Sequence, residues 1–315
     1  CLAARYPRSR FLLADKMPLV LIREERELEE YFRAQLERCG VDYFDYYLIH
    51  DMGGNRREAA KDVRVFEFLS EKKKAGQARQ IGFSFHDTAD VLDEILTEHP
   101  EVDFVQLQLN YLDWESDTVQ SRKCYETAKK HGKPVIVMEP VKGGTLANIP
   151  QEAEEWFRAC HPHWSAASWA IRFAASHENV MLVLSGMSSL EQVEDNTSYM
   201  ESFTPFTERE YALVQKAADR INGTIAIPCT GCSYCIQDCP KHIPIPRYFS
   251  LYNADMRELE TKAWTAQTML YSHFSEQFGK AGDCVGCGRC EKMCPQHLPV
   301  RTWLNRVAER FERAL

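Results

Sequence analysis

Short apolar runs alternate with longer amphipathic stretches from Phe11 to Tyr199. The short runs contain aliphatic and aromatic residues and predict buried strands. The stretches between them place apolar residues three and four positions apart, which predicts helices. The predicted strands span Phe11–Ala14, Tyr43–Ile49, Arg79–Phe83, Phe104–Asn110, Pro134–Met138 and Val180–Leu184. The predicted helices span Glu24–Cys39, Glu58–Lys74, Thr88–Glu98, Thr118–His131, Ser165–Ser176 and Leu190–Tyr199.

This alternation predicts an α/β fold with a parallel sheet and helical crossovers. The pattern contains six βα units, whereas a TIM barrel has eight. Because the sequence starts at Cys1 and not at a methionine, we expect a TIM (β/α)8 barrel that lacks its first two βα units. The alternative is an open doubly wound sheet, which normally carries a glycine-rich dinucleotide turn after its first strand. The sequence contains no G-x-G-x-x-G motif.

Two copies of the pattern C-x2-C-x2-C-x3-C-P lie near the C-terminus. They contain Cys229, Cys232, Cys235 and Cys239, and then Cys284, Cys287, Cys290 and Cys294. Such runs ligate 4Fe–4S clusters, and the fourth cysteine of each run usually binds the other cluster. We therefore expect two 4Fe–4S clusters, one on the first three cysteines plus Cys294 and one on the second three plus Cys239. Zinc sites and disulfides are the alternatives, although zinc typically uses two separated cysteine pairs.

The part of the chain that carries the cysteines follows a different pattern from the part before it. A predicted helix over Thr207–Ile221 precedes a stretch around Asn222–Pro228 that we interpret as the domain boundary. The segment between the cysteine runs is mostly helical in pattern. We therefore expect a partial barrel over residues 1–225 and a mostly α-helical dicluster ferredoxin-like domain over residues 226–315.

Composition restricts the class of partner. The chain has 38 Lys and Arg against 46 Asp and Glu, a net charge of −8, which argues against a nucleic-acid partner. No apolar run approaches the roughly 20 residues of a membrane span, so we expect no membrane partner. Eight of the 12 cysteines lie in the two motifs, and the other four are scattered, namely Cys1, Cys39, Cys124 and Cys160. This usage is typical of a reducing compartment, and we expect the cytoplasm. A targeting signal could lie upstream of Cys1.

Two residues with reactive side chains follow predicted strands. Lys16 comes just after the first strand and His50 directly after the second. In TIM barrels the reactive side chains sit at the carboxyl ends of the strands. Lys16 and His50 are therefore candidate catalytic residues, although a solvated lysine and a structural histidine would fit the pattern too.

Residues 34–50 read A-Q-L-E-R-C-G-V-D-Y-F-D-Y-Y-L-I-H. This stretch resembles the aldo/keto reductase signature R-L-G-x-D-Y-x-D-L-Y-L-x-H, and the fused cysteine module is similar to that of the family's iron–sulfur-containing branch. The resemblance implies NAD(P)H-dependent reduction of a carbonyl, with Lys16 lowering the pKa of an acidic tyrosine and His50 orienting the carbonyl. The family's catalytic Asp and Tyr belong to the second barrel strand and its loop, which this sequence does not contain.

The resemblance also implies cofactor contacts. The matching positions are Ser84, Gln106, Asn110, Gly186, Ser188, Gln192 and Asn196. Three positions depart from the family pattern: Phe85 replaces an asparagine, Met138 replaces a stacking tyrosine, and Gln192 replaces the arginine that commonly grips the 2′-phosphate. Loss of that cation weakens the preference for NADP, so either NADP or NAD fits.

We thus predict an oxidoreductase of the aldo/keto reductase type with a small carbonyl substrate. Nicotinamide passes two electrons as hydride, whereas each cluster accepts one electron at a time, so an external electron carrier is a further expected partner. The alternative is an iron–sulfur electron-transfer or redox-sensing protein whose barrel is a scaffold without hydride chemistry. The cysteine motifs are compatible with both.

Overall fold

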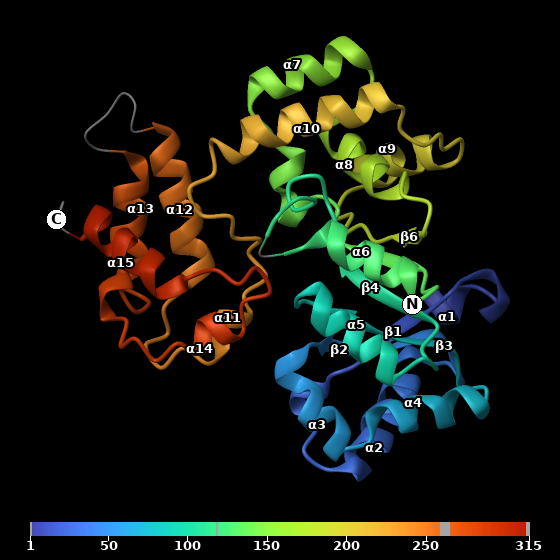
Figure 1. Cartoon of the computed structure of the whole chain (residues 1–315). Helices are drawn as coiled ribbons and strands as arrows, with labels where there is room; N and C mark the ends of the chain where they lie inside the picture. The colour runs from blue at the N-terminus through green and yellow to red at the C-terminus, as the bar shows by residue number, and fades with distance from the viewer. Residues whose placement is uncertain (1, 118, 259–264, 313–315) are drawn as a thin grey trace. The chain divides into compact units, whose positions relative to one another are not determined.

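The computed structural model describes residues 2–117, 119–258 and 265–312, and it divides into two compact units (Figure 1). The first unit comprises the chain up to Pro140 together with Arg172–Gln192, and the second comprises Val141–Ile171 and the chain from Val193 onward. Cys1, the expected helix start at Thr118 and the last three residues, 313–315, lie outside the described residues.

Six strands of the described residues form one sheet in the first unit. They are β1 (Ala14–Met17), β2 (Phe44–Met52), β3 (Ala78–Phe85), β4 (Phe104–Gln108), β5 (Val135–Met138) and β6 (Val180–Val183). Each strand pairs in parallel with the next one along the chain. A doubly wound sheet reverses its strand order at a switch point, whereas barrel strands follow chain order. The observed order therefore decides against the doubly wound alternative.

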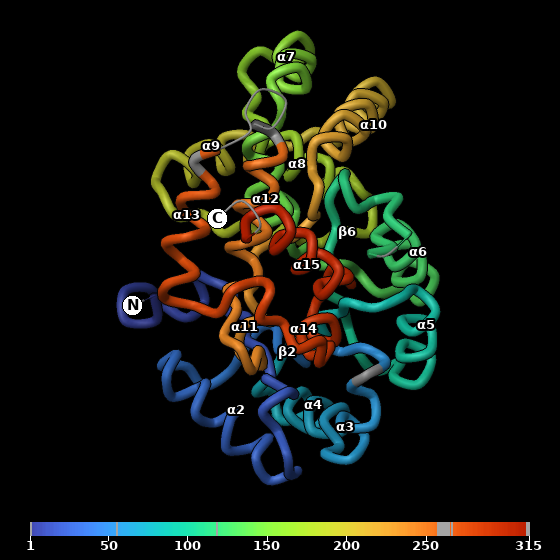
Figure 2. The backbone as a smooth tube through the Cα atoms, turned by 90° about the vertical axis from the view of Figure 1, so that its left-hand side faces the viewer, coloured from blue at the N-terminus to red at the C-terminus, as the bar shows by residue number. Residues whose placement is uncertain are grey.

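The outer face of the sheet is covered by helices. Around the outside of the sheet lie, in succession, α2 (Glu25–Cys39), α4 (Val65–Lys74), α5 (Ala89–Glu98) and α6 (Ser121–Lys130), as Figure 2 shows. Phe32 of α2 packs edge-on against Phe44 and Tyr47 of β2, with ring centroids 5.7 and 4.8 Å apart. Tyr47 faces α2, and successive strand residues point to opposite faces, so Tyr46 and Leu48 lie on the inner face.

A small apolar cluster of Leu48, Phe104 and Ile136 lies on the inner face. Gly82 lies between the first two in the strand pairing, and a Cβ atom added to it would come within 2.4 Å of the Phe104 carbonyl oxygen. The same Cβ would lie 3.0 Å from two carbon atoms of the Phe104 ring, so both the backbone and the ring of Phe104 require glycine at this position.

Two sequence predictions are wrong in detail, and one helix was not predicted. The first strand lies at Ala14–Met17 and not at Phe11–Ala14, because Phe11 is extended but pairing begins only at Ala14. The predicted helix Glu58–Lys74 is two helices, α3 (Arg57–Asp62) and α4, because Arg64 adopts a left-handed conformation (φ 53°). The helix α7 (Gln151–Cys160) was not predicted.

The second unit is helical in its described residues. Its own elements are η4 (Lys142–Ala147), α7, α10 (Glu208–Asn222), α11 (Tyr234–Gln237), α12 (Ile245–Glu258), α13 (Ala266–Ser275), η5 (Ala281–Asp283), α14 (Arg289–Lys292) and α15 (Val300–Phe311). The helices α8 (Ala166–Ala175) and α9 (Leu190–Met200) run from one unit into the other, and the first unit also contains the short α1 (Leu2–Arg5), η1 (Arg8–Arg10), η2 (Leu19–Leu21) and η3 (Gly54–Arg56). No described helix combines the length and the apolar character needed to cross a bilayer.

The helices α12 and α15 are joined by a buried ion pair. Arg310 donates to both carboxylate oxygens of Asp255, at 2.6 and 3.1 Å, and Asp255 has no exposed surface. The hydroxyl of Thr265 also donates to Asp255. Tyr248, Tyr271 and Phe311 complete the core around this pair.

Candidate catalytic face and cluster site

Lys16 and His50 lie on one face of the sheet. Lys16 pairs with Leu48 of the neighbouring strand, and His50 follows Leu48 by two residues, so all three share the inner face. Burial lowers the pKa of Lys16, partly opposed by the charge of Asp15. Burial also lowers the pKa of His50, and the positive charge of Lys16 lowers it further. At pH 7 the His50 imidazole is therefore mostly neutral and suited to hydrogen-bond a carbonyl oxygen.

The backbone at Lys16 is connected to α2 by side-chain hydrogen bonds. The amide nitrogen Nε2 of Gln35 donates to the Lys16 carbonyl at 2.8 Å, and the Tyr47 hydroxyl donates to Oε1 of Gln35 at 2.6 Å. Burial and the charge of Asp15 raise the pKa of Tyr47. Tyr47 therefore acts as a structural residue on the outer face.

Ser84 and Gln106 extend the same inner face across β3 and β4. They pair directly with each other and are 0% and 3% exposed. The Ser84 hydroxyl accepts a hydrogen bond from the Asp51 backbone N–H at 2.9 Å. Nε2 of Gln106 lies 3.2 Å from the sulfur of Met138. Four of the predicted site residues, on four consecutive strands, thus share one polar face near the carboxyl ends.

Gln108 belongs to the same face, although the sequence pattern did not single it out. It lies two residues beyond Gln106, is 5% exposed, and donates to Asp113 at 3.0 Å. The alternation of strand side chains could have indicated it. Its amide connects the polar face to the turn that follows β4.

Asn110 lies in that turn, where its side chain has several partners. Its amide donates to Asp113 and to the Glu139 carbonyl, at 2.8 and 3.2 Å, and its oxygen accepts from the backbone N–H groups of Leu112 and Asp113. The amide therefore fixes the turn after β4.

The other predicted cofactor residues lie after β6. Gly186, Ser188 and Gln192 are exposed. Oε1 of Gln192 accepts from the Ser188 N–H at 2.7 Å, and Asn196 accepts from the Tyr199 hydroxyl at 2.6 Å. These contacts shape the loop before α9 and the helix itself, and a role in binding a nucleotide stays a prediction.

The second unit brings the motif cysteines into two groups. Burial and, to a smaller extent, the nearby Cys229, Cys232 and Cys294 together raise the pKa of Cys235 to about 12. Cys294 belongs to the second motif, so the first group combines three cysteines of one run with the fourth of the other. The remaining four cysteines, Cys239, Cys284, Cys287 and Cys290, line one small cavity. This grouping has the crossed arrangement that the motifs predict.

The two cysteine loops share one backbone conformation. Gly231 and Ser233 have φ angles of 73° and 67°, and the corresponding Gly286 and Gly288 have 70° and 73°. Left-handed residues of this kind let successive backbone N–H groups form a concavity that binds anions, including iron–sulfur centres. The loops and the cysteine donors therefore fit 4Fe–4S clusters.

The cysteine sulfurs do not converge on a single ion. In the part of the chain that the structure describes, no three His, Cys, Asp or Glu side chains lie close enough to hold one metal ion, and the described cysteines form no disulfides. A cubane places its irons at separate corners, so its thiolates stand apart. Spacing and residue type thus favour clusters over the zinc and disulfide alternatives.

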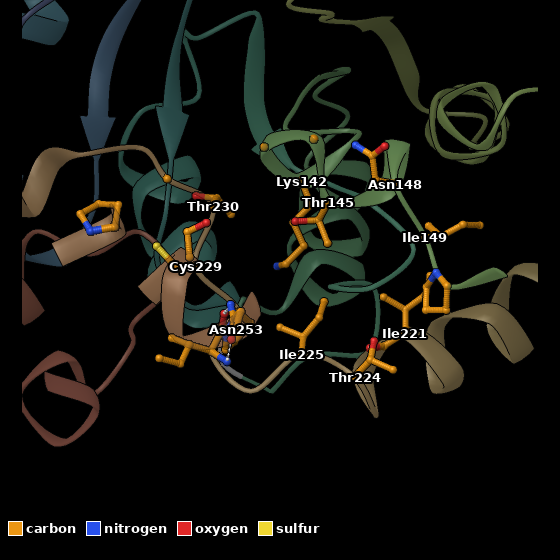
Figure 3. A pocket seen from close by; sticks show the side chains of 18 residues that line it. Lys142, Thr145, Asn148, Ile149, Ile221, Thr224, Ile225, Cys229, Thr230 and Asn253 are labelled. Carbon is orange, nitrogen blue, oxygen red and sulfur yellow. Dashed lines mark hydrogen bonds between the residues drawn. The ribbon is translucent and has the colours of Figure 1, made fainter. Parts of the chain in front are cut away.

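A cavity of about 480 Å³ lies beside the first cysteine loop (Figure 3). Cys229 and Thr230 line one side of it, and Ile221 and Thr224 line the other. Lys142, which also lines the cavity, is 3% exposed and donates to Oε1 of Gln296 at 3.3 Å.

The chain combines a polar face on a barrel-type sheet with a helical module that carries two cysteine groups. This combination is typical of two-part oxidoreductases. Residues 1–219 match the family described as "Aldo/keto reductase family", and residues 228–299 match the "4Fe-4S dicluster domain". The chain therefore belongs to the aldo/keto reductase family and carries a C-terminal 4Fe–4S dicluster domain.

Individual proteins agree with this membership. An aldo-keto reductase of Mycobacterium avium is 28% identical over 53% of this chain and 54% of its own length. The NADH-specific methylglyoxal reductase of Escherichia coli is 25% identical over 54% of this chain and 58% of its own. The chain thus spans somewhat more than half the length of these curated relatives.

Solved structures show the same fold. The holo form of an aldo-keto reductase from Bacillus halodurans aligns with a TM-score of 0.55 and 22% identity, over 68% of this chain and 74% of that one. The enzyme from Klebsiella pneumoniae in complex with NADP and acetate aligns with a TM-score of 0.53 and 17% identity, over 67% and 71%. The matched part of the chain thus has an aldo/keto reductase-type fold.

Proposed function

We propose that the protein is an NAD(P)H-dependent oxidoreductase that reduces a small carbonyl compound to an alcohol. Two 4Fe–4S clusters in its C-terminal domain would transfer electrons to an external carrier. The observation that carries the proposal is the polar face on which Lys16, His50, Ser84 and Gln106 lie together. The cytoplasm stays the expected location.

The nucleotide, when bound, would supply hydride. Lys16 would place its positive charge beside the proton donor and lower the pKa of that group. His50, held mostly neutral by burial and by Lys16, would hydrogen-bond the carbonyl oxygen as negative charge develops. Ser84 and Gln106 would hold the nicotinamide side of the cofactor.

We further propose that the six strands correspond to six of the eight strands of a complete barrel. The last strand, β6, has exposed apolar residues, including Leu182 (37%), and Leu184 just beyond it is 40% exposed, as expected for a strand that lacks a neighbour. The family's Asp and Tyr would lie on the second barrel strand and in the loop after it. Without the tyrosine we expect activity lower by about 10²–10⁴-fold.

The cluster ligands we propose are Cys229, Cys232, Cys235 and Cys294 for one cluster and Cys239, Cys284, Cys287 and Cys290 for the other. The barrel part would end near residue 225, and the cluster domain would cover residues 226–315. The ranges matched by the two families, residues 1–219 and 228–299, support this division.

The second candidate is an iron–sulfur electron-transfer or redox-sensing protein whose barrel is only a scaffold. Two predicted cofactor-binding side chains, Asn110 and Gln192, favour this candidate. Both already form hydrogen bonds to groups of their own segments instead of being free for a nucleotide. Under this candidate the cluster domain would exchange electrons without hydride chemistry.

The test is an anaerobic titration of the 315-residue protein with NADH and with NADPH, followed by electron paramagnetic resonance. Dithionite reduces the clusters independently and serves as the reference. Cluster signals that grow as the nucleotide is oxidised would support the two-part enzyme. Signals from dithionite alone, with no nucleotide binding in a fluorescence titration, would refute it in favour of the scaffold candidate. A protein without bound iron would refute both.

A further inference from the structure

The two cysteine loops differ at one position inside an otherwise matching backbone. The first loop reads Cys229-Thr230-Gly231-Cys232, and the second reads Cys284-Val285-Gly286-Cys287. Both loops turn at a glycine with a φ angle near 70°. Thr230 and Val285 have nearly the same shape, so the hydroxyl group is the main chemical difference between them.

That hydroxyl is buried without a partner. Among the described residues, Oγ1 of Thr230 is shielded from solvent and makes no hydrogen bond. Leaving a buried polar atom unpaired costs about 1–3 kcal/mol, so such an atom calls for an explanation. Val285 is 59% exposed, so the second loop presents its side chain to water.

A second segment of the chain packs closely against the Thr230 loop. Gly143 adopts a left-handed conformation (φ 60°) directly against the loop, and a Cβ atom on it would come within 2.3 Å of the Thr230 carbonyl oxygen. Gly144 has φ 94°, but nothing lies within 4 Å of a Cβ added there. The contact between the two segments thus depends on Gly143.

We infer that the Thr230 hydroxyl donates a hydrogen bond to a sulfur of the cluster held by Cys229, Cys232, Cys235 and Cys294, and that it raises the reduction potential of that cluster. This inference rests on the proposed cluster ligands. A cluster that gains an electron becomes more negative at its sulfurs, and a hydrogen bond to a charged acceptor is stronger than one to a neutral acceptor. The donor therefore stabilises the reduced form, and hydrogen bonds to sulfur are among the factors that set cluster potentials.

The test replaces Thr230 by valine, which makes the first loop match the second. Potentiometric titration under argon, followed by electron paramagnetic resonance, measures the two cluster potentials. We expect one of them to fall by about 59 mV, a tenfold change in the one-electron equilibrium, while the other stays constant. Thr230→Ser keeps a hydroxyl and should retain most of the native potential.

Two matched variants separate hydrogen bonding from disturbance of the loops. Val285→Thr adds a hydroxyl at the exposed position, where water can bind it, so both potentials should stay constant. Gly143→Ala should shift the potential of the first cluster because it forces the segments apart. Gly144→Ala carries a similar backbone strain without the collision, and should not shift it.

Pulsed resonance in D₂O gives a second measurement. Thr230→Val should remove one exchangeable deuterium coupling from the reduced cluster. Unchanged potentials and couplings in a Thr230→Val protein with full iron and sulfide content would overturn the inference. Iron content too low for two clusters in the native protein would instead overturn the proposed ligands.

Discussion

The buried pair Asp255–Arg310 allows a quantitative prediction about what holds the cluster domain together. Asp255 has no exposed surface and Arg310 is 18% exposed at its side chain, with nitrogen–oxygen distances of 2.6 and 3.1 Å. Arg310→Ala leaves the carboxylate buried with the hydroxyl of Thr265 as its remaining donor in the described hydrogen bonds. Breaking a buried pair in this way costs about 3–5 kcal/mol.

Native-state hydrogen exchange measures this loss directly, because amides in α12 and α15 exchange when the helices separate. Each 1.4 kcal/mol corresponds to a factor of ten, so exchange in the α12 and α15 peptides should become about 100- to 4,000-fold faster. The exposed pair Arg220–Glu152, at 2.7 Å and with side chains 42% and 53% exposed, provides the matched control. Because such surface pairs contribute about 0.2–1 kcal/mol, Arg220→Ala should accelerate exchange by at most about fivefold.

A double variant separates charge from packing. Replacing Asp255 and Arg310 together by leucine removes the stranded charge, and such replacements are often neutral or stabilising. Protection should therefore recover. Equal loss of protection in Arg310→Ala and Arg220→Ala would refute a special contribution of the buried pair. Exchange in the double variant as fast as in Arg310→Ala would refute the stranded charge as the cause.

Three further predictions address the clusters, the pH dependence and the inner face of the sheet. Cys232 and Cys294 are expected on one cluster, so replacing both by alanine should leave about half the native iron. Replacing Cys232 and Cys239, which are expected on different clusters, should remove nearly all of the iron. The reverse result would contradict the crossed grouping. Burial lowers the pKa of His177 from 6.5 to about 4. As the pH falls, the unfolded chain therefore binds a proton at this histidine before the native protein does. The free energy of unfolding should fall by about 3 kcal/mol between pH 6.5 and 4. His177→Phe should flatten the pH dependence of the urea midpoint, and an unchanged slope would rule out this histidine as the cause. In Gly82→Ala the new Cβ would lie 2.4 Å from a carbonyl oxygen of the next strand. This variant should destabilise the first unit by at least about 1–3 kcal/mol in urea unfolding. An unaltered urea midpoint would show that the sheet can adjust.

The sequence by itself determined the features that depend on short-range patterns. The α2 helix was predicted as Glu24–Cys39 and observed as Glu25–Cys39, because a capping box between Glu24 and Glu27 and the left-handed Gly40 mark its ends locally. The spacing of each cysteine run likewise lies within about ten residues of chain. The general rule for such runs is what predicts the exchange of their fourth cysteines.

Tertiary structure alone decided which residues meet. Strand register, which depends on pairing between segments far apart in the chain, put Lys16 and His50 on one face and added Gln108 to it. The break at Arg64 depends on how α3 and α4 pack, which local periodicity does not record. Thr230 looked like an ordinary loop residue until the fold placed Gly143 against it. The burial of a side chain and the residues it contacts depend on segments that lie far apart in the chain. For that reason the sequence pattern predicted the helices and strands, whereas the folded structure determined the chemistry of each position.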